Sequence, residues 1–147
     1  MPDSAANQHV WPQQRNQKPG CGFPQAFLCA CFCLRTGALL SYEMGDKKSH
    51  ELPLMRKQWS TFKPGDIFLG DKGFCSYYDL ASLKERGVDS VITLARRLPV
   101  SEAEAAKVLG KEDRLIQWKK PGRTHAASYS QEESDRLPDS LVLRQIK

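Results

Sequence analysis

One acidic residue, Asp71, stands in a sequence context that suits metal-ion chemistry. It follows the short apolar run of residues 66–70 and precedes Ser76, where a helix is expected to begin. A carboxylate at the end of a strand in a parallel sheet lies at the edge where ligands collect. There it can hold Mg²⁺, which takes hard oxygen ligands. The alternative is that Asp71 caps the following helix or closes a turn.

Three cysteines, Cys29, Cys31 and Cys33, alternate along one apolar run and raise the question of a second metal site. Zinc sites usually combine closely spaced cysteines with a distant second pair or with histidines. The histidines of this chain are isolated from one another. Alternate spacing places the thiols on one face of a strand, which suits small buried residues. We therefore expect structural cysteines and not metal ligands.

The residues on both sides of the aspartate predict a strand, a helix and a second strand in succession. Residues 66–71 form the first strand. The helix begins at Ser76, with Asp79 as its capping partner, and ends at Gly87. Residues 88–95 form the next strand, so the unit is a crossover with parallel strands.

The N-terminal part of the chain predicts an irregular segment, a hairpin and a helix. Residues 1–24 show neither a helical nor an alternating period. The apolar run 25–35 predicts a strand covered on both faces, and residues 38–44 form its hairpin partner across the turn at Thr36-Gly37. Residues 49–62 place apolar side chains at helical spacing. The remaining expected elements are a helix over 101–109, strands over 115–118 and 141–146, and a loop over 119–138.

Length and composition are those of one globular domain. A chain of 147 residues, of which 40% are apolar, can bury a core. The net charge of +5 permits contact with nucleic acid without requiring it. The sequence has no signal-peptide pattern and no apolar run long enough to span a membrane, so we expect a cytoplasmic protein that does not bind membranes.

Several short motifs occur in the order in which a known family has them. They are PGCGFP at 19–24, TGA at 36–38, HE at 50–51, KPGD at 63–66, GDKGFCSY at 70–77, DRLIQWKKP at 113–121, and the segment 137–144, which begins with LP and ends with LR. Together they resemble the IS-four family of insertion-sequence transposases over nearly the whole chain. A single one of these motifs would be a weak signal, whereas their collinear order is specific.

The resemblance implies an α/β fold, a ribonuclease-H-like mixed sheet with flanking helices, and a site of three acidic metal ligands. Asp71 matches the second ligand, at the end of the fourth strand. The first and third ligands have no match here, so we expect a partial domain that lacks its first central strand and last helix. Glu104 and Lys111 fit only part of the third-ligand motif, and we attribute that fit to coincidence on a surface helix. Two strand edges would then lack their shared neighbour, which predicts poor solubility.

The same resemblance divides the chain into three parts. Residues 1–24 would be an irregular N-terminal segment, residues 25–100 a partial ribonuclease-H-like catalytic core, and residues 101–147 a helix plus a β-rich insertion that is incomplete at its C-terminus.

The function that the resemblance implies is cleavage and strand transfer of DNA at transposon ends, with Mg²⁺ or Mn²⁺, by a transposase dimer. Two metal ions activate the attacking oxygen and stabilise the leaving oxygen, and several carboxylates must hold them. One aspartate does not suffice, so we expect the chain to be inactive alone. Two alternatives stay open: a non-catalytic DNA-binding remnant of a transposase, and an unrelated Mg²⁺-dependent phosphohydrolase that uses Asp71.

Six basic residues are candidates for contact with DNA phosphates: Lys72, Arg96, Arg97, Lys119, Lys120 and Arg123. Contacts of this kind give salt-dependent affinity with little dependence on sequence. The alternative for each is a solvated surface charge. Trp118, beside two of these lysines, would either stack on a base or pack within its own pair of strands.

Overall fold

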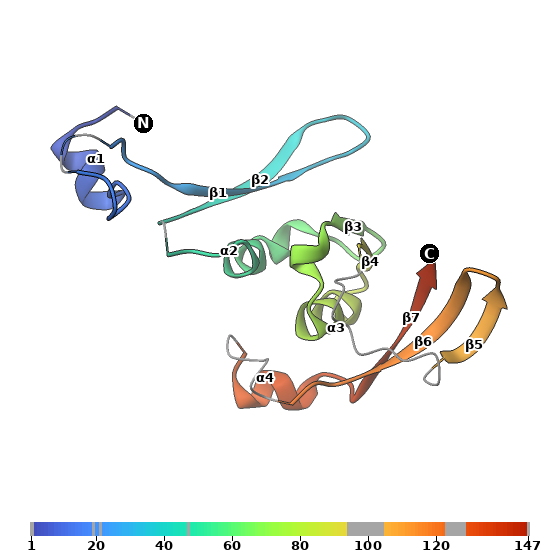
Figure 1. The fold of residues 1–147 in the computed structure, drawn as a ribbon. Helices are drawn as coiled ribbons and strands as arrows, with labels where there is room; N and C mark the ends of the chain where they lie inside the picture. The colour runs from blue at the N-terminus through green and yellow to red at the C-terminus, as the bar shows by residue number, and fades with distance from the viewer. Residues whose placement is uncertain are drawn as a thin grey trace. The chain divides into compact units, whose positions relative to one another are not determined.

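The chain has a mixed α/β structure in two compact units, Met1–Phe62 and Lys63–Lys147 (Figure 1). The computed structural model describes residues 2–18, 20, 22–46, 48–93, 105–122 and 129–146. The boundary between the units falls inside segment 25–100. The assignment of that segment to one partial catalytic core remains a prediction.

The N-terminal unit begins with a short helix, α1 (Ala5–Val10), so the expectation of a wholly irregular segment 1–24 was wrong. Ser4 caps this helix, because its hydroxyl accepts a hydrogen bond from the backbone N–H of Asn7 at 3.2 Å. The side chain of Gln8 then ties the segment together, donating to Asp3 Oδ1 at 2.7 Å and to the Gly22 carbonyl at 3.0 Å. Glutamine links of this kind leave no periodic signal in the sequence.

The predicted hairpin of the N-terminal unit is confirmed. β1 (Phe27–Phe32) pairs antiparallel with β2 (Leu39–Gly45), as Figure 1 shows. Gly37 closes the turn with a φ of 70° and donates its N–H to the Cys33 carbonyl at 2.7 Å. A positive φ favours glycine, which accounts for the residue at this place.

One face of the hairpin is covered by α2 (Glu51–Lys57) and the 3-10 turn η1 (Trp59–Thr61). Cys29 and Cys31 are buried on this face, where Cys31 Sγ lies 3.6 Å from Met55 Sδ. Burial raises the pKa of both thiols, which favours the neutral form of a structural cysteine. Gln58 is also buried; it accepts from Ser41 Oγ at 2.7 Å and donates to the Cys29 carbonyl at 3.1 Å.

The other face of the hairpin is open, so the expectation that the strand 25–35 is covered on both faces was wrong. Leu28, Phe32 and Tyr42 are 62%, 58% and 56% exposed and help to line a groove of about 850 Å³ within this unit. Side chains alternate along a strand, so these residues point away from the face that α2 covers. Among the described residues of this unit, no second layer packs on them.

The C-terminal unit contains the predicted crossover. β3 (Ile67–Gly70) is followed by the 3-10 turn η2 (Lys72–Phe74), α3 (Tyr77–Glu85) and β4 (Asp89–Ile92). The two strands are parallel, with Ile67 opposite Asp89 and Gly70 opposite Ile92. Gly87 ends the helix with a φ of 74°.

The predicted capping pair at the start of α3 was wrong. Ser76 is the N-cap residue, but its side chain makes no capping hydrogen bond. Asp79 is buried instead, and its Oδ1 accepts a hydrogen bond from Tyr129 Oη at 2.8 Å. The carboxylate that the local pattern assigned to the helix start is therefore bound by a residue far along the chain.

The rest of the unit is a three-stranded antiparallel sheet of β5 (Ala105–Gly110), β6 (Asp113–Lys119) and β7 (Ser140–Ile146). The strands expected over 115–118 and 141–146 are confirmed and are longer than expected. The helix expected over 101–109 was wrong for residues 105–109; residues 101–104, with Glu104, lie outside the described residues. Helix propensity is a weak preference, and pairing with β6 overrides it in this Ala- and Lys-containing segment. Lys111 lies in the β5–β6 turn.

A short helix, α4 (Gln131–Arg136), occupies part of the expected loop 119–138. It begins with a capping box, in which Ser130 and Glu133 each accept a hydrogen bond from the backbone N–H of the other. A serine followed three residues later by a glutamate is a known helix-start signal. The sequence thus contained the information for this helix.

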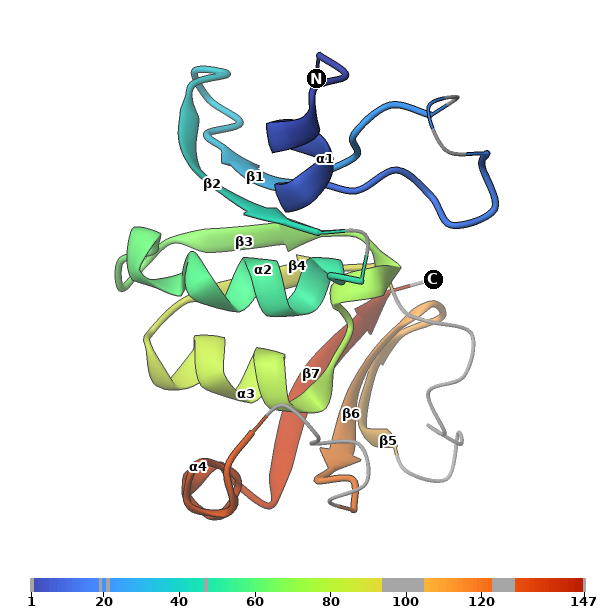
Figure 2. The same cartoon turned by 90° about the vertical axis from the view of Figure 1, so that its left-hand side faces the viewer.

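The core of the C-terminal unit lies between α3 and the three-stranded sheet, which Figure 2 shows behind that helix. Tyr77, Leu80 and Ala81 of α3 pack with Trp118 and Leu141 of the sheet. The rings of Tyr77 and Trp118 meet edge to face, with centroids 5.4 Å apart. This contact between segments far apart in sequence fixes the sheet to the helix.

The described strands form three separate sheets, β1-β2, β3-β4 and β5-β6-β7, so the mixed sheet that the resemblance implies remains a prediction. β1 and β3 fall into different compact units. The ribonuclease-H-like arrangement and the missing strand and helix remain predictions. Among the described residues, no helix has the length and apolar character to cross a membrane.

The open hairpin face predicts that the chain associates with itself in solution. Leu28→Lys places a charge in the apolar groove and should lower light scattering and the fluorescence of a dye that binds apolar surface. Ser60→Lys adds the same charge at an exposed position of the same unit and should change neither. A wild-type chain that is a monodisperse monomer would contradict the prediction.

Candidate functional site

Asp71 lies where the sequence places it, directly after β3 at the carboxyl end of the parallel β3–β4 pair. It is exposed, and its Oδ1 accepts a hydrogen bond from the backbone N–H of Gly73 at 2.7 Å. Its backbone carbonyl accepts from the N–H of Phe74 at 3.1 Å. The alternative role of Asp71 as a turn-closing cap is therefore confirmed, and it coexists with a position suited to ligand binding.

The turn after β3 closes tightly because Gly70 has no side chain. A Cβ atom at this position would lie 3.0 Å from Cε1 of Phe68 and 3.2 Å from Cβ of Phe74. The two phenylalanine rings meet edge to face, with centroids 5.7 Å apart. Phe74 thus packs back onto the strand and holds the intervening Asp71 at the sheet edge.

The carboxylate of Asp71 has one oxygen available for a metal ion. Within the described part of the chain, Oδ1 is engaged in the turn and Oδ2 forms no hydrogen bond or ion pair. A free, exposed carboxylate oxygen fits the hard-oxygen preference of Mg²⁺. However, no group of three His, Cys, Asp or Glu side chains that could hold a metal occurs among the described residues. Asp71 fits as one ligand of a larger set.

Other aspartates of the β3–β4 pair lie at its opposite end. Asp66 directly precedes β3, and Asp89 is the first residue of β4. Asp66 Oδ2 accepts a hydrogen bond from the backbone N–H of Lys63 at 2.8 Å. The length of the strands, about 13 Å for four residues, separates these carboxylates from Asp71. They do not supply the second carboxylate that a phosphohydrolase centred on Asp71 would need.

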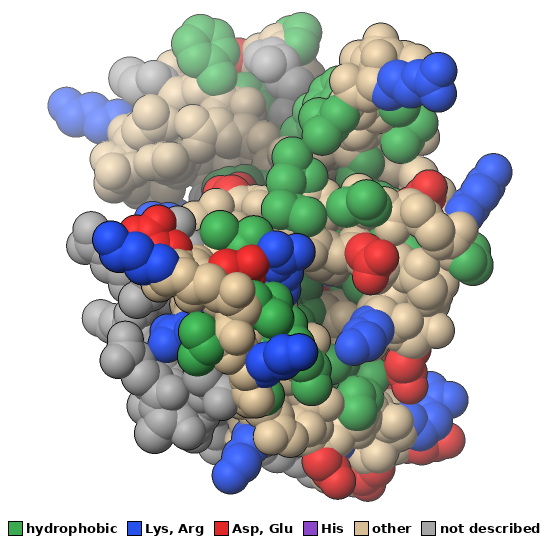
Figure 3. Space-filling model, turned by 90° about the vertical axis from the view of Figure 1, so that its right-hand side faces the viewer, with side chains coloured by type: hydrophobic (Ala, Val, Ile, Leu, Met, Phe, Trp, Pro, Cys, Tyr) green, Lys and Arg blue, Asp and Glu red, His purple; other side chains and the backbone are tan. Residues whose placement is uncertain are grey.

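The predicted DNA-contact residues have different surroundings. Lys72, in η2, and Lys119, at the end of β6, are exposed. Arg96, Arg97 and Arg123 lie outside the described residues. Figure 3 shows Lys and Arg side chains spread over one side of the molecule, with Asp and Glu among them. A contact role for these residues remains a prediction.

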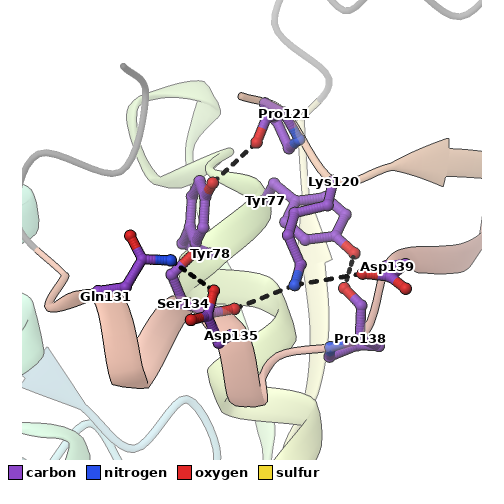
Figure 4. Close-up of polar contacts among 9 residues, drawn as sticks. All are labelled: Tyr77, Tyr78, Lys120, Pro121, Gln131, Ser134, Asp135, Pro138 and Asp139. Atoms are coloured by element: carbon purple, nitrogen blue, oxygen red, sulfur yellow. Dashed lines mark hydrogen bonds and ion pairs between the residues drawn. The ribbon is translucent and has the colours of Figure 1, made fainter. Parts of the chain in front are cut away.

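Lys120 is held by the protein itself. Its Nζ donates a hydrogen bond to the Ser134 carbonyl at 3.0 Å and lies 3.5 Å from Asp139 Oδ1 (Figure 4). The side chain is only 17% exposed. These contacts give Lys120 a structural role in joining the end of β6 to α4 and the start of β7. They leave little of its charge for a DNA phosphate.

Two neighbouring tyrosines that the sequence analysis did not single out attach α3 to the connection between β6 and β7. Tyr77 Oη donates to the Pro138 carbonyl at 2.6 Å, and Tyr78 Oη donates to the Pro121 carbonyl at 2.8 Å (Figure 4). Burial raises the pKa of Tyr77 to about 12, so its hydroxyl keeps its proton and remains a donor. No local pattern pointed to these bonds, because both acceptors are backbone atoms far along the chain.

Trp118 packs inside its own unit. It is 8% exposed and contacts Tyr77, so the alternative of packing within the strands is confirmed and its ring does not present a face for stacking on a base. The Trp118 ring therefore contributes to the stability of its unit.

The adjacent lysines at the end of β6 should respond differently to substitution. Lys120→Ala removes the bond to the Ser134 carbonyl and should lower the free energy of unfolding by roughly 1 kcal/mol. Lys119→Ala changes an exposed side chain and should alter it by less than about 0.5 kcal/mol. Urea unfolding of the two variants beside the wild type measures both values. Equal losses in the two variants would contradict the different roles of the lysines.

Comparison with known proteins identifies the family. The sequence model described as "Transposase DDE domain" matches residues 5–142, which is nearly the whole chain. None of the curated proteins and none of the solved structures with which the chain was compared matches it. The family implies a role in transposition, binding to DNA, and a general use of divalent metal ions. The chain belongs to the transposase DDE domain family.

Proposed function

We propose that Asp71 is a metal-binding carboxylate of DDE transposase chemistry and that it corresponds to the second of three acidic ligands. The observation that carries this proposal is the position of its carboxylate: exposed, at the carboxyl end of a parallel strand, and fixed by its own turn. That edge of a parallel sheet is where ligands bind in α/β proteins. The parallel β3-α3-β4 unit is compatible with a ribonuclease-H-like core of the IS-four type.

The roles of the residues around Asp71 follow from their contacts. Oδ2 is the atom that would hold the ion, while Oδ1 stays bound to the N–H of Gly73. When bound, Mg²⁺ or Mn²⁺ supplies Lewis acidity for hydrolysis of a phosphodiester bond and for attack by a 3′-hydroxyl. Lys72 is next to Asp71 and exposed, so its ammonium group can attract a DNA phosphate to this edge.

The polypeptide of this sequence, by itself, does not cut DNA. Two metal ions a few ångströms apart need several carboxylates to hold them. In the described ranges no acidic side chain joins Asp71 in a metal-binding group, and residues 93–100, which follow β4, contain no acid in the sequence. A non-catalytic DNA-binding role, the alternative that the sequence left open, would not require the charge of Asp71.

The first test separates the metal role of Asp71 from its capping role. Asp71→Asn keeps an oxygen acceptor for the N–H of Gly73, whereas Asp71→Ala removes both the acceptor and the charge. In an NMR titration with Mn²⁺, the amide signals of residues 70–74 should broaden in the wild type and in neither variant. Only Asp71→Ala should also shift the Gly73 amide signal in the absence of metal. Equal broadening in the wild type and Asp71→Asn would rule out the metal role.

A second test concerns catalysis by the chain alone. Purified protein incubated with Mg²⁺ or Mn²⁺ and a supercoiled plasmid that carries transposon ends should give no nicked product above background. Nicking is read from conversion to the open-circular form on a gel. Robust cutting that Asp71→Ala abolishes would show that the chain completes its own site and would overturn this part of the proposal.

A further inference from the structure

The sheet β5-β6-β7 has an outer face that points away from the core of its unit. Directly paired residues of antiparallel strands point to the same side of the sheet. The buried pairs Ile116–Leu143 and Trp118–Leu141 face the core, so the alternate pairs face outward. The outward residues, which together form the outer face, are Lys107, Asp113, Leu115, Gln117, Lys119, Ser140, Val142, Arg144 and Ile146.

Part of the charge of the outer face is balanced by an ion pair between two of its own residues. Arg144 binds Asp113 with two hydrogen bonds, from Nε to Oδ1 at 2.9 Å and from Nη2 to Oδ2 at 2.6 Å. This hydrogen-bonded contact lowers the pKa of Asp113, so the acid stays ionised and its charge is balanced by Arg144. Lys107 and Lys119 form no ion pair with any acidic residue in the described ranges, and both are exposed. Two positive charges of this face are left for a partner.

A neutral polar pair lies between the two lysines. Gln117 Nε2 donates to Ser140 Oγ at 3.0 Å, and the glutamine stays exposed. Lys107 lies opposite Leu115, and Lys119 follows four residues later on β6, about 13 Å along the strand. Duplex DNA carries a dense row of phosphates along each strand, so lysines at this spacing can each contact a separate phosphate.

The outer face lies in the same compact unit as Asp71. The end of β7, with Arg144 and Ile146, lies across a groove of about 650 Å³ from Cys75 and from Ile92 at the end of β4. Cys75 follows the turn that Asp71 closes. The end of β7 therefore lies across this groove from the end of β4 and from the residue that follows the Asp71 turn.

We propose that the outer face of β5-β6-β7 binds the phosphate backbone of duplex DNA, with Lys107 and Lys119 as its cationic contacts and Gln117 as a neutral contact between them. This inference rests on the proposed function, because it takes DNA as the polyanion. Charge complementarity favours this partner, since both lysines are exposed and form no ion pair in the described ranges. Leu115, Val142 and Ile146 are apolar side chains of the same face. The binding is salt-dependent and largely independent of sequence.

The test measures the affinity of the full chain for a labelled 20-base-pair duplex of arbitrary sequence by fluorescence anisotropy at several NaCl concentrations. Lys107→Ala and Lys119→Ala should each reduce the slope of log Kd against log salt by roughly 0.9. Gln117→Glu puts a negative charge between the lysines and should weaken binding at low salt. Lys63→Ala and Gln25→Glu make the same charge changes at exposed positions outside this face and serve as controls.

Wild-type slopes and affinities in all three outer-face variants would overturn the inference, as would a wild-type chain that binds no duplex. Tighter binding of an RNA duplex than of the DNA duplex would overturn the assignment of DNA as the partner. These outcomes are distinguishable from failure of the proposed function, because the Mn²⁺ titration at Asp71 contains no nucleic acid. A loss of slope in Lys107→Ala and Lys119→Ala, with both controls unchanged, is the expected result.

Discussion

The turn that follows β3 is the constraint on which the candidate site depends. Its geometry is set by two features, the missing side chain of Gly70 and the bond from the Gly73 N–H to the carboxylate of Asp71. Gly70 allows Phe74 to pack against Phe68, and the carboxylate closes the turn between them. Because the aspartate is held by the turn that it forms, its second oxygen stays at the sheet edge and in solvent. A longer or looser loop would leave the same residue without a defined position.

The contacts between α3 and the three-stranded sheet fix the positions of further elements of the C-terminal unit. Tyr77 and Tyr78, at the start of α3, each donate a hydrogen bond to a backbone carbonyl of the β6–β7 connection, and Lys120 joins that connection to α4. The ring of Tyr77 also packs on Trp118. Backbone hydrogen bonds run from Asp71 through η2 to the first turn of α3. The proposed metal ligand and the outer face of the sheet therefore belong to one connected arrangement of hydrogen bonds and packing contacts.

Elements with a local sequence pattern were predicted correctly. Elements whose conformation depends on contacts with residues far along the chain were not. The β3-α3-β4 unit was predictable because apolar strands, a helix start and Gly87 follow one another within a short segment. β5 was not, because Ala105–Gly110 has no strand pattern of its own and extends only through pairing with β6. The lysines at 119 and 120 are equivalent in sequence, yet one is exposed and the other is bound to Ser134 and Asp139. Likewise, Asp79 fits a local capping pattern, but burial beside Tyr129 determines its role. Asp71 was placed correctly because its position depends only on the strand before it and the turn after it.

The capping role of Asp71 does not by itself account for an aspartate at this position. Asparagine and serine cap turns and helix starts about as well as aspartate does, because the bond needs one acceptor oxygen and no charge. An exposed carboxylate also gains little from the turn electrostatically, since η2 is a short 3-10 segment with a small dipole. What the carboxylate adds over an amide is a negative charge and a second acceptor oxygen, and the described structure uses neither. A divalent cation would use both. The carboxylate of Asp71 thus carries a charge and an acceptor oxygen that its turn does not require. This surplus is the physical argument for a ligand at this edge, and it does not depend on the family to which the chain belongs.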